Sequence, residues 1–135
     1  MLTESSEPHA TRVLVVDDDL AVGVIVARIL EHAGYGVCLA FSGALALAAL
    51  TSGAWDFTLV LSDVRMPGMN GVDLAHEVQR GWPDLPIILM SGDESPVTLA
   101  AHGLTDVPFL QKPFDQAELL ELVSAAFKPP QLTGC

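Results

Sequence analysis

The strongest constraint on the fold of this chain is a repeated alternation between short apolar runs and segments with helical spacing. The runs are rich in Val, Leu and Ile, which is typical of buried strands, and each is followed by a segment in which apolar residues recur three or four positions apart. The apolar runs predict strands at 12–17, 35–41, 57–61, 86–90 and 107–111. The intervening segments predict helices at 20–34, 42–50, 71–80, 95–102 and 115–127. Three of these helices have predicted N-caps, Asp19, Ser42 and Asp115, and Glu118 has capping-box spacing from Asp115.

Strands that alternate with helices through short links form βαβ units, and repeated βαβ units build a parallel sheet covered on both faces. We therefore predict an α/β fold: a doubly wound, five-stranded parallel sheet with five helices. The length of 135 residues fits one such domain. We expect it to span residues 12–127, with a polar N-terminal arm at 1–11 and a short C-terminal tail at 128–135.

The charge of the chain narrows the classes of partner. Its net charge is −11, from 17 acidic residues against six Lys and Arg, with no basic stripe. This pattern disfavours binding to nucleic acid or to an anionic membrane, so we expect a protein partner. The longest apolar stretch, 20–27, is far shorter than the roughly 20 residues that span a bilayer. No secretion signal is visible, and Cys38 and Cys135 form no metal or disulfide pattern, so we expect a cytoplasmic protein.

Polar residues stand where several of the predicted strands end. Asp17 ends the first predicted strand and Asp18 follows it. Asp63 comes after the third strand, Ser91 after the fourth and Lys112 after the fifth. Any one of them alone is more often a turn residue or a helix cap. Ligands of open α/β sheets, however, bind outside the carboxyl ends of the strands. Together these residues therefore predict a site at that edge of the sheet.

The acids of this predicted site need a cation. Carboxylates about 5 Å apart repel each other by roughly 3 kcal/mol a pair at an effective dielectric near 20. Hard oxygen ligands with no His or Cys nearby favour Mg²⁺. Lys112 adds a mobile positive charge of the kind that pairs with phosphate, and Ser91 adds a hydroxyl. These parts indicate a site that handles a phosphoryl group.

Four motifs, VLVVDDD, LVLSDVRMPGMNG, ILMSGD and FLQKPF, occur in this order and fall on the predicted strands. With them the chain resembles the receiver domain of bacterial two-component response regulators over about residues 12–127. The resemblance implies a flavodoxin-like strand order of 2-1-3-4-5. It also implies that Asp63 is the phosphoacceptor. Asp63 would attack a phosphohistidine on a sensor histidine kinase or a histidine phosphotransfer protein and form an acyl phosphate.

The same resemblance implies a magnesium site. Asp18 and Asp63 would bind Mg²⁺ directly, and Asp17 would bind it through a water molecule. The backbone carbonyl of Arg65 would complete the protein ligands.

The resemblance also implies how a signal leaves the site. Ser91 and Lys112 would each bind an oxygen of the phosphoryl group, and Phe109 stands at the aromatic switch position. The Lys112–Pro113 bond resembles one that is cis in the family. Phosphorylation would change a surface formed by the fourth helix, fifth strand and fifth helix, which would then bind an unknown downstream protein.

Four interpretations remain open. We expect a receiver that stands alone and catalyses only its own phosphoryl transfer and dephosphorylation, since only eight residues follow Phe127. The sequence is also compatible with a receiver module of a longer hybrid histidine kinase or multidomain regulator. A Mg²⁺-dependent aspartyl-phosphate phosphatase is a distant alternative, because the chain has no room for a substrate-shielding cap. A pseudo-receiver that is never phosphorylated is disfavoured, because no key residue is missing.

Overall fold

The computed structural model describes residues 11–104 and 106–127. It has five strands and five helices in strict alternation, so the predicted α/β class is confirmed. The predicted tail, and all of the predicted arm except Thr11, lie outside the described residues. In chain order the elements are β1 (Arg12–Val16), α1 (Leu20–His32), β2 (Gly36–Ala40), α2 (Gly43–Ser52), β3 (Leu59–Asp63), α3 (Gly71–Gly81), β4 (Ile87–Ser91), α4 (Pro96–Ala101), β5 (Phe109–Gln111) and α5 (Gln116–Phe127).

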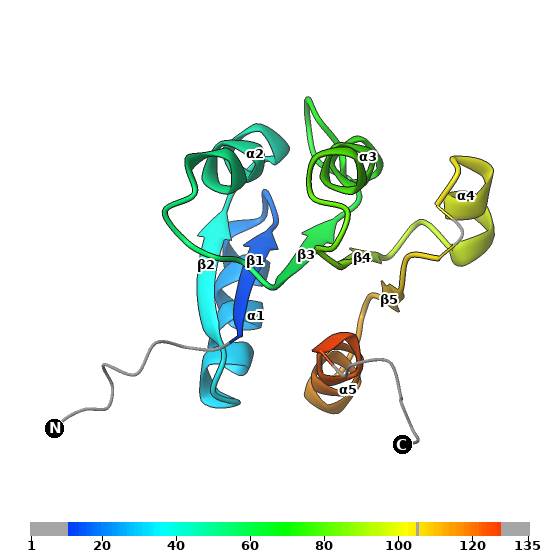
Figure 1. Cartoon of the computed structure of the whole chain (residues 1–135). Coiled ribbons are helices and arrows are strands. Elements are labelled where there is room, and N and C mark those ends of the chain that lie inside the picture. Colours follow the sequence, from blue (N-terminus) through cyan, green and yellow to red (C-terminus); the bar gives the residue numbers. More distant parts are fainter. Residues whose placement is uncertain (1–10, 105, 128–135) are drawn as a thin grey trace, which may run out of the picture.

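The five strands form one parallel sheet in the order β2-β1-β3-β4-β5, which confirms the expected 2-1-3-4-5 order. Helices α2 and α3 lie on one face of this sheet, and α1 and α5 on the other (Figure 1). The order reverses at β1, because the chain moves from β1 outward to β2 and then crosses back to β3. The carboxyl ends of β1 and β3 are therefore neighbours at the point where such sheets bind ligands.

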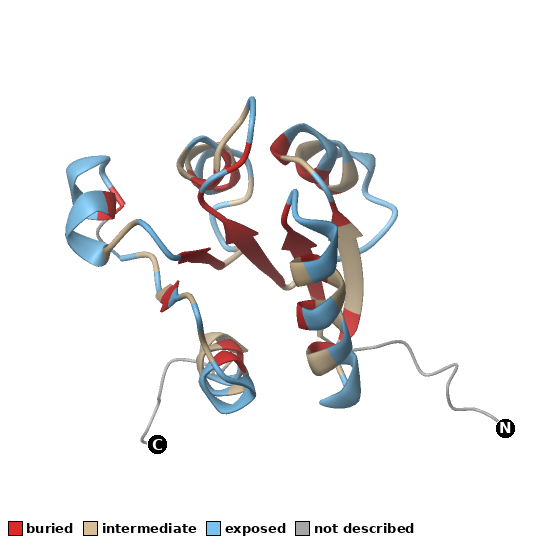
Figure 2. Ribbon diagram, turned by 180° about the vertical axis from the view of Figure 1, so that it is seen from behind, coloured by how far each residue is buried: buried red, intermediate tan, exposed pale blue. Residues whose placement is uncertain are grey.

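Alternate residues of each strand supply two separate cores. On β1, Leu14 and Val16 belong to the cluster on the side of α2 and α3, whereas Val13 and Val15 belong to the cluster with α1 and α5. Successive strand side chains point to opposite faces, so a strand covered on both sides is apolar throughout. The central strands are accordingly buried along their whole length (Figure 2).

Side-chain caps fix where the helices begin. Asp19 and Ser42 accept backbone N–H bonds from the first turns of α1 and α2, as predicted. Asp115 and Glu118 form the predicted reciprocal capping box, with N–H bonds of 2.8 and 2.9 Å. Within the part of the chain that the structure describes, no helix has both the length and the apolar character needed to cross a membrane.

The predicted range of the third strand, 57–61, is wrong at both ends. Backbone pairing with β1 and β4 continues through Ser62 and Asp63, so the strand runs two residues further. At the other end, Thr58 exchanges hydrogen bonds with Arg12 outside the ladder. As a result, Asp63 is the last residue of β3, and its backbone is held by the sheet rather than by a loop.

The other strands differ from their predicted ranges by one or two residues at an end. β1 stops at Val16, one residue before the predicted end, and β4 extends one residue to include Ser91. β5 begins at Phe109 rather than at Val107, because Pro108 has no N–H for the ladder. These shifts leave the acids, Ser91, Arg65 and Lys112 at, or one or two residues beyond, the carboxyl ends of their strands, whereas Phe109 begins β5.

Helix α4 is short and weakly anchored. Pro96 occupies its first turn after the cap Ser95, and its only buried side chain is Leu99. The ring Nε2 of His76 on α3 lies 2.9 Å from the carbonyl oxygen of His102, just after α4. Gly103 then takes a positive φ of 85° that ends the helix.

Candidate functional site

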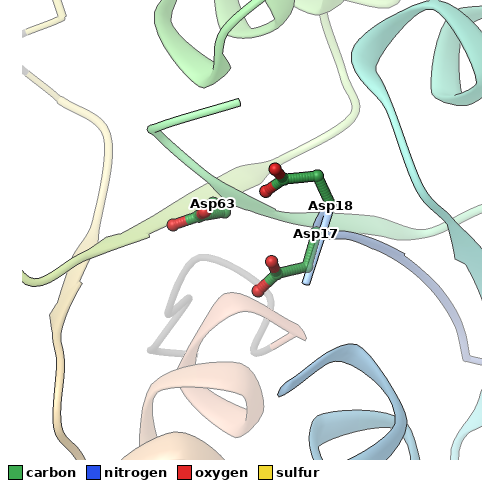
Figure 3. A group of neighbouring side chains, drawn as sticks. All are labelled: Asp17, Asp18 and Asp63. Carbon is green, nitrogen blue, oxygen red and sulfur yellow. The ribbon is translucent and has the colours of Figure 1, made fainter. Parts of the chain in front are cut away.

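Three carboxylates meet at the carboxyl ends of β1 and β3. Asp17 and Asp18 directly follow β1, and Asp63 ends β3 (Figure 3). Each residue offers one oxygen, and these oxygens all lie within 4.8 Å of one another. Asp17 is fully buried and Asp63 is 7% exposed, whereas Asp18 is open to solvent. The structure thus brings together the three acids that the sequence assigns to one site.

Lys112 reaches these acids from the far side of β4. Its Nζ lies 3.2 Å from Asp63 Oδ1 and 3.4 Å from Asp17 Oδ2. The backbone N–H of Lys112 donates to the carbonyl of Ser91, and the Lys112–Pro113 bond is cis, as the resemblance implied. The lysine therefore bridges two of the three carboxylates.

The charges of the site shift two pKa values. Burial raises the pKa of Asp63; the Lys112 ammonium opposes this, and repulsion from Asp17 and Asp18 adds to it, so the pKa stays above its usual value. Burial alone would lower the pKa of Lys112, but attraction to Asp63 and Asp17 outweighs it and the pKa is raised.

These pKa shifts indicate that the negative charge of the site exceeds the positive charge of Lys112. Three carboxylates surround a single ammonium, and the donors that face the centre are oxygens. Mg²⁺ binds such hard oxygen ligands through one or two carboxylates and keeps several waters, which the exposed side of Asp18 allows. The residues present therefore fit a divalent cation.

The raised pKa of Asp63 predicts that the ionised Asp63 carboxylate destabilises the folded, metal-free protein. The folded state binds the Asp63 proton more tightly than the unfolded state, so stability is lost as pH rises from about 4 through the folded pKa. We expect Asp63→Asn to raise the free energy of unfolding by about 1 kcal/mol at pH 7.5 without metal.

Urea denaturation at pH 7.5 and pH 4.5 measures this effect. The gain should shrink at the lower pH, where the wild-type carboxyl is more protonated. Added Mg²⁺ should stabilise the wild type more than the variant. An equal gain at both pH values would show that the ionised carboxylate is not the cause.

Ser91 lies beside the acids at the end of β4. Its neighbour Met90 pairs with Asp63 across the sheet, and Ser91 itself is buried. Its hydroxyl oxygen accepts the backbone N–H groups of Asp93 and Glu94 at 3.0 and 3.1 Å. The hydroxyl proton can still be donated, so Ser91 can form hydrogen bonds to a ligand and to the β4–α4 loop at the same time.

Arg65 lies in the β3–α3 loop, and its side chain faces the β4–α4 loop. Its Nε lies 3.6 Å from Glu94 Oε2 and 3.8 Å from Asp93 Oδ2. The sequence points to Arg65 for its backbone carbonyl and does not predict these side-chain pairs. Asp93 and Glu94 are signalled only by their positions two and three residues beyond the end of β4. The metal-binding role of the Arg65 carbonyl and the switch role of the half-buried Phe109 remain predictions.

Gly71 is a supporting residue whose close packing on the end of β3 the sequence did not reveal. Its N–H donates to the carbonyl of Val64 at 2.8 Å, where α3 begins. A Cβ atom here would lie 2.8 Å from Val64 Cα and would overlap the carbonyl oxygen of Asp63. The start of α3 therefore packs against the backbone that carries Asp63. The only sequence signal is a glycine placed directly after the cap residue Asn70.

Comparisons with known proteins agree with this geometry. The sequence profile of the response regulator receiver domain matches residues 13–124. The transcriptional regulatory protein FixJ of Bradyrhizobium diazoefficiens is 35% identical over 117 residues, covering 86% of this chain and 56% of FixJ. The autoinducer sensor kinase/phosphatase CqsS of Vibrio cholerae is 37% identical over 123 residues, covering 87% of this chain and 17% of CqsS. The chain thus spans about half or less of the length of these relatives.

Solved structures give the same result. The chemotaxis response regulator CheY4 of Vibrio cholerae superposes with a TM-score of 0.78 at 29% identity, covering 87% of this chain and 98% of CheY4. The response regulator TrrA of Thermotoga maritima, solved in complex with Mg²⁺ and BeF, has a TM-score of 0.78 at 30% identity, covering 87% and 99%.

Proposed function

The chain belongs to the response regulator receiver domain family of two-component systems, and from this premise we propose that it accepts a phosphoryl group on Asp63 and switches a partner-binding surface. The observation that carries the proposal is the cluster of Asp17, Asp18 and Asp63 with the Lys112 ammonium 3.2 Å from Asp63. Phosphoryl transfer needs mainly positioning and charge neutralisation, and this cluster can supply both.

In the proposed reaction, a carboxylate oxygen of Asp63 attacks the phosphorus of a phosphohistidine on a sensor histidine kinase or a histidine phosphotransfer protein. A P–O bond forms and the P–N bond breaks with its electron pair going to the ring nitrogen, and the histidine leaves as neutral imidazole after taking one proton from water. The sheet holds the Asp63 backbone in the last position of β3, so the nucleophile needs little reorganisation. The product is an acyl phosphate on this chain.

The remaining residues would hold the phosphoryl group. Lys112 would move from its carboxylate partners to a phosphoryl oxygen, and Ser91 would donate its hydroxyl proton to another. Asp18, Asp63 and the Arg65 carbonyl would hold Mg²⁺, with Asp17 acting through water. When bound, the ion would neutralise charge on the transferring phosphoryl oxygens. The magnesium in the TrrA complex supports this assignment.

The signal would leave through the β4–α4 loop. Because Ser91 accepts the N–H groups of Asp93 and Glu94, a hydroxyl drawn to the phosphoryl group would pull that loop with it. Helix α4 buries only Leu99 and can shift at low cost. Phe109 on the adjacent β5 would turn inward, and the surface of α4, β5 and α5 would change its affinity for a downstream protein.

This function would make the chain a cytoplasmic phosphoprotein switch rather than an enzyme acting on a separate substrate. It would catalyse only its own phosphoryl transfer and dephosphorylation. The similarity to the sensor kinase/phosphatase CqsS supports a second arrangement, in which the same receiver chemistry serves within a hybrid histidine kinase or multidomain regulator.

Intact-mass measurement after incubation with acetyl phosphate tests the proposal. With Mg²⁺ we expect the mass to increase by one phosphoryl group, and with EDTA we expect little or no increase. Asp63→Asn should abolish the gain, whereas Asp56→Asn, which removes an exposed acid from the loop after α2, should keep it. Absence of the gain in the wild type, or its persistence in Asp63→Asn, would refute Asp63 as the phosphoacceptor.

A further inference from the structure

A groove of about 400 Å³ lies between β5 and α5, on the surface assigned above to partner binding. Its apolar lining comes from both elements, and two glutamates of α5 stand beside it. The lining residues are Phe109, Leu110, Glu118, Glu121, Leu122 and Ala125. Apolar side chains beside carboxylates form a surface that can hold an apolar group and select the charge around it.

Nearly all charged residues in the sequence around this groove are acidic, and of these, among the residues that the structure describes, only Asp93 and Glu94 pair with a basic residue, Arg65. Between Asp93 and Phe127 there are six Asp and Glu residues and one basic residue, Lys112. The Lys112 ammonium faces Asp17 and Asp63 in the phosphorylation site and not the groove. The next basic residue, Lys128, lies outside the described residues. The groove therefore presents negative charge that the described part of the chain does not neutralise.

The two glutamates beside the groove are placed to act together. Glu118 and Glu121 are three residues apart on α5 and both are exposed, so they share one face of the helix. One carboxylate oxygen of Glu118 accepts the backbone N–H of Asp115, which leaves the second oxygen for a partner. Both glutamates lie outside the ion pairs that the structure forms among its described residues.

We propose that the groove binds a cationic segment of a partner protein, with an apolar side chain seated against Leu110 and Leu122 and Lys or Arg residues beside Glu118 and Glu121. This inference rests on the proposed function, because that function assigns the surface to output. A second copy of this chain is a poor occupant, since it would bring the same acids into contact. Nucleic acid is excluded by the same charge.

The groove can also report phosphorylation. Phe109 lines the groove and is half-buried, and it packs against the core cluster on the side of α2 and α3, so it connects the groove to that core. If the ring turns inward after phosphorylation, the wall moves and the space available to an apolar anchor changes. Phe109 would then belong both to the partner-binding groove and to the phosphorylation switch.

An NMR titration of the unphosphorylated chain of 135 residues tests the inference. The probe is an amphipathic peptide of about fifteen residues built from Leu and Lys at helical spacing, and its twin carries Glu in place of Lys. We expect the Lys peptide to shift backbone resonances of β5 and α5, and the Glu twin to cause no saturable shift. Glu121→Lys should weaken binding about tenfold, and higher salt should weaken it further.

A charge-matched variant separates the groove from general attraction between an acidic protein and a basic peptide. Asp56→Lys makes the same change in net charge on the loop between α2 and β3, and should change the affinity less than about twofold. Shifts centred on α1 or on the Asp17 cluster, or equal weakening by both variants, would overturn the inference. The titration uses unphosphorylated protein, so its result stands apart from the mass measurement that tests the proposed function.

Discussion

Gly71→Ala is expected to destabilise the protein by about 3 kcal/mol or more, a large share of the stability of a typical domain. The added methyl group would lie 2.8 Å from Val64 Cα and would overlap the carbonyl oxygen of Asp63. Both obstacles are backbone atoms within or directly after β3, so no side chain can rotate to relieve the clash. Either α3 must move away from the sheet or the Asp63 backbone must shift.

Urea denaturation of Gly71→Ala and Gly81→Ala measures this effect with a matched control. Gly81 ends the same helix, has no heavy atom near an added Cβ and takes no positive φ. Alanine there should be neutral or should stabilise the helix by up to about 1 kcal/mol. If Gly71→Ala unfolds at the same urea concentration as the wild type, the close packing of α3 on β3 is wrong.

Lys112→Met should destabilise the metal-free protein by about 3 kcal/mol. Methionine keeps much of the apolar stem but removes the ammonium that, among residues 11–104 and 106–127, is the only one paired with Asp17 and Asp63. Asp17 is fully buried, and a buried charge that loses its partner costs several kcal/mol. Added Mg²⁺ should recover part of the loss, because a divalent ion can replace the missing positive charge. Acetyl phosphate should also label this variant more slowly than the wild type.

Arg80→Met is the control for Lys112→Met, because it also replaces one basic residue that forms an ion pair. Arg80 Nη1 lies 3.1 Å from Glu77 Oε1, but the Arg80 and Glu77 side chains are 70% and 41% exposed. An exposed pair of this kind contributes only about 0.5 kcal/mol. Thermal or urea denaturation with and without Mg²⁺ compares the two. Equal losses, or a loss in Lys112→Met that Mg²⁺ leaves unchanged, would show that Lys112 does not neutralise the acid cluster.

The number and order of the elements were predictable from the sequence, because burial leaves a local signature. A strand covered on both faces must be apolar throughout, and a helix packed on one face must repeat its apolar residues every three or four positions. The caps Asp19 and Asp115 were equally readable, since a cap bonds only to residues in its own first turn. The strand ends were less predictable, because Asp63 joins β3 through pairing with a residue of β4.

The candidate site was predictable to the same degree. All carboxyl ends of a parallel sheet lie at one edge, so the acids and Lys112 had to gather there once the fold class was known. Sequence alone therefore determined the fold class, the residues of the candidate site and the sign of their charge. These properties depend on residue type and on order along the chain, both of which are printed in the sequence.

Tertiary structure alone decided the contacts between residues that are distant in the chain. Lys112 bridges Asp17 and Asp63, and Arg65 pairs with Glu94. Two further features also depend on such distant contacts. One is the close approach of Gly71 to the Asp63 backbone, which leaves no room for a Cβ atom, and the other is the groove between β5 and α5. Each depends on distances of a few ångströms between separate elements, set by how the whole core packs, and no local pattern encodes such a distance.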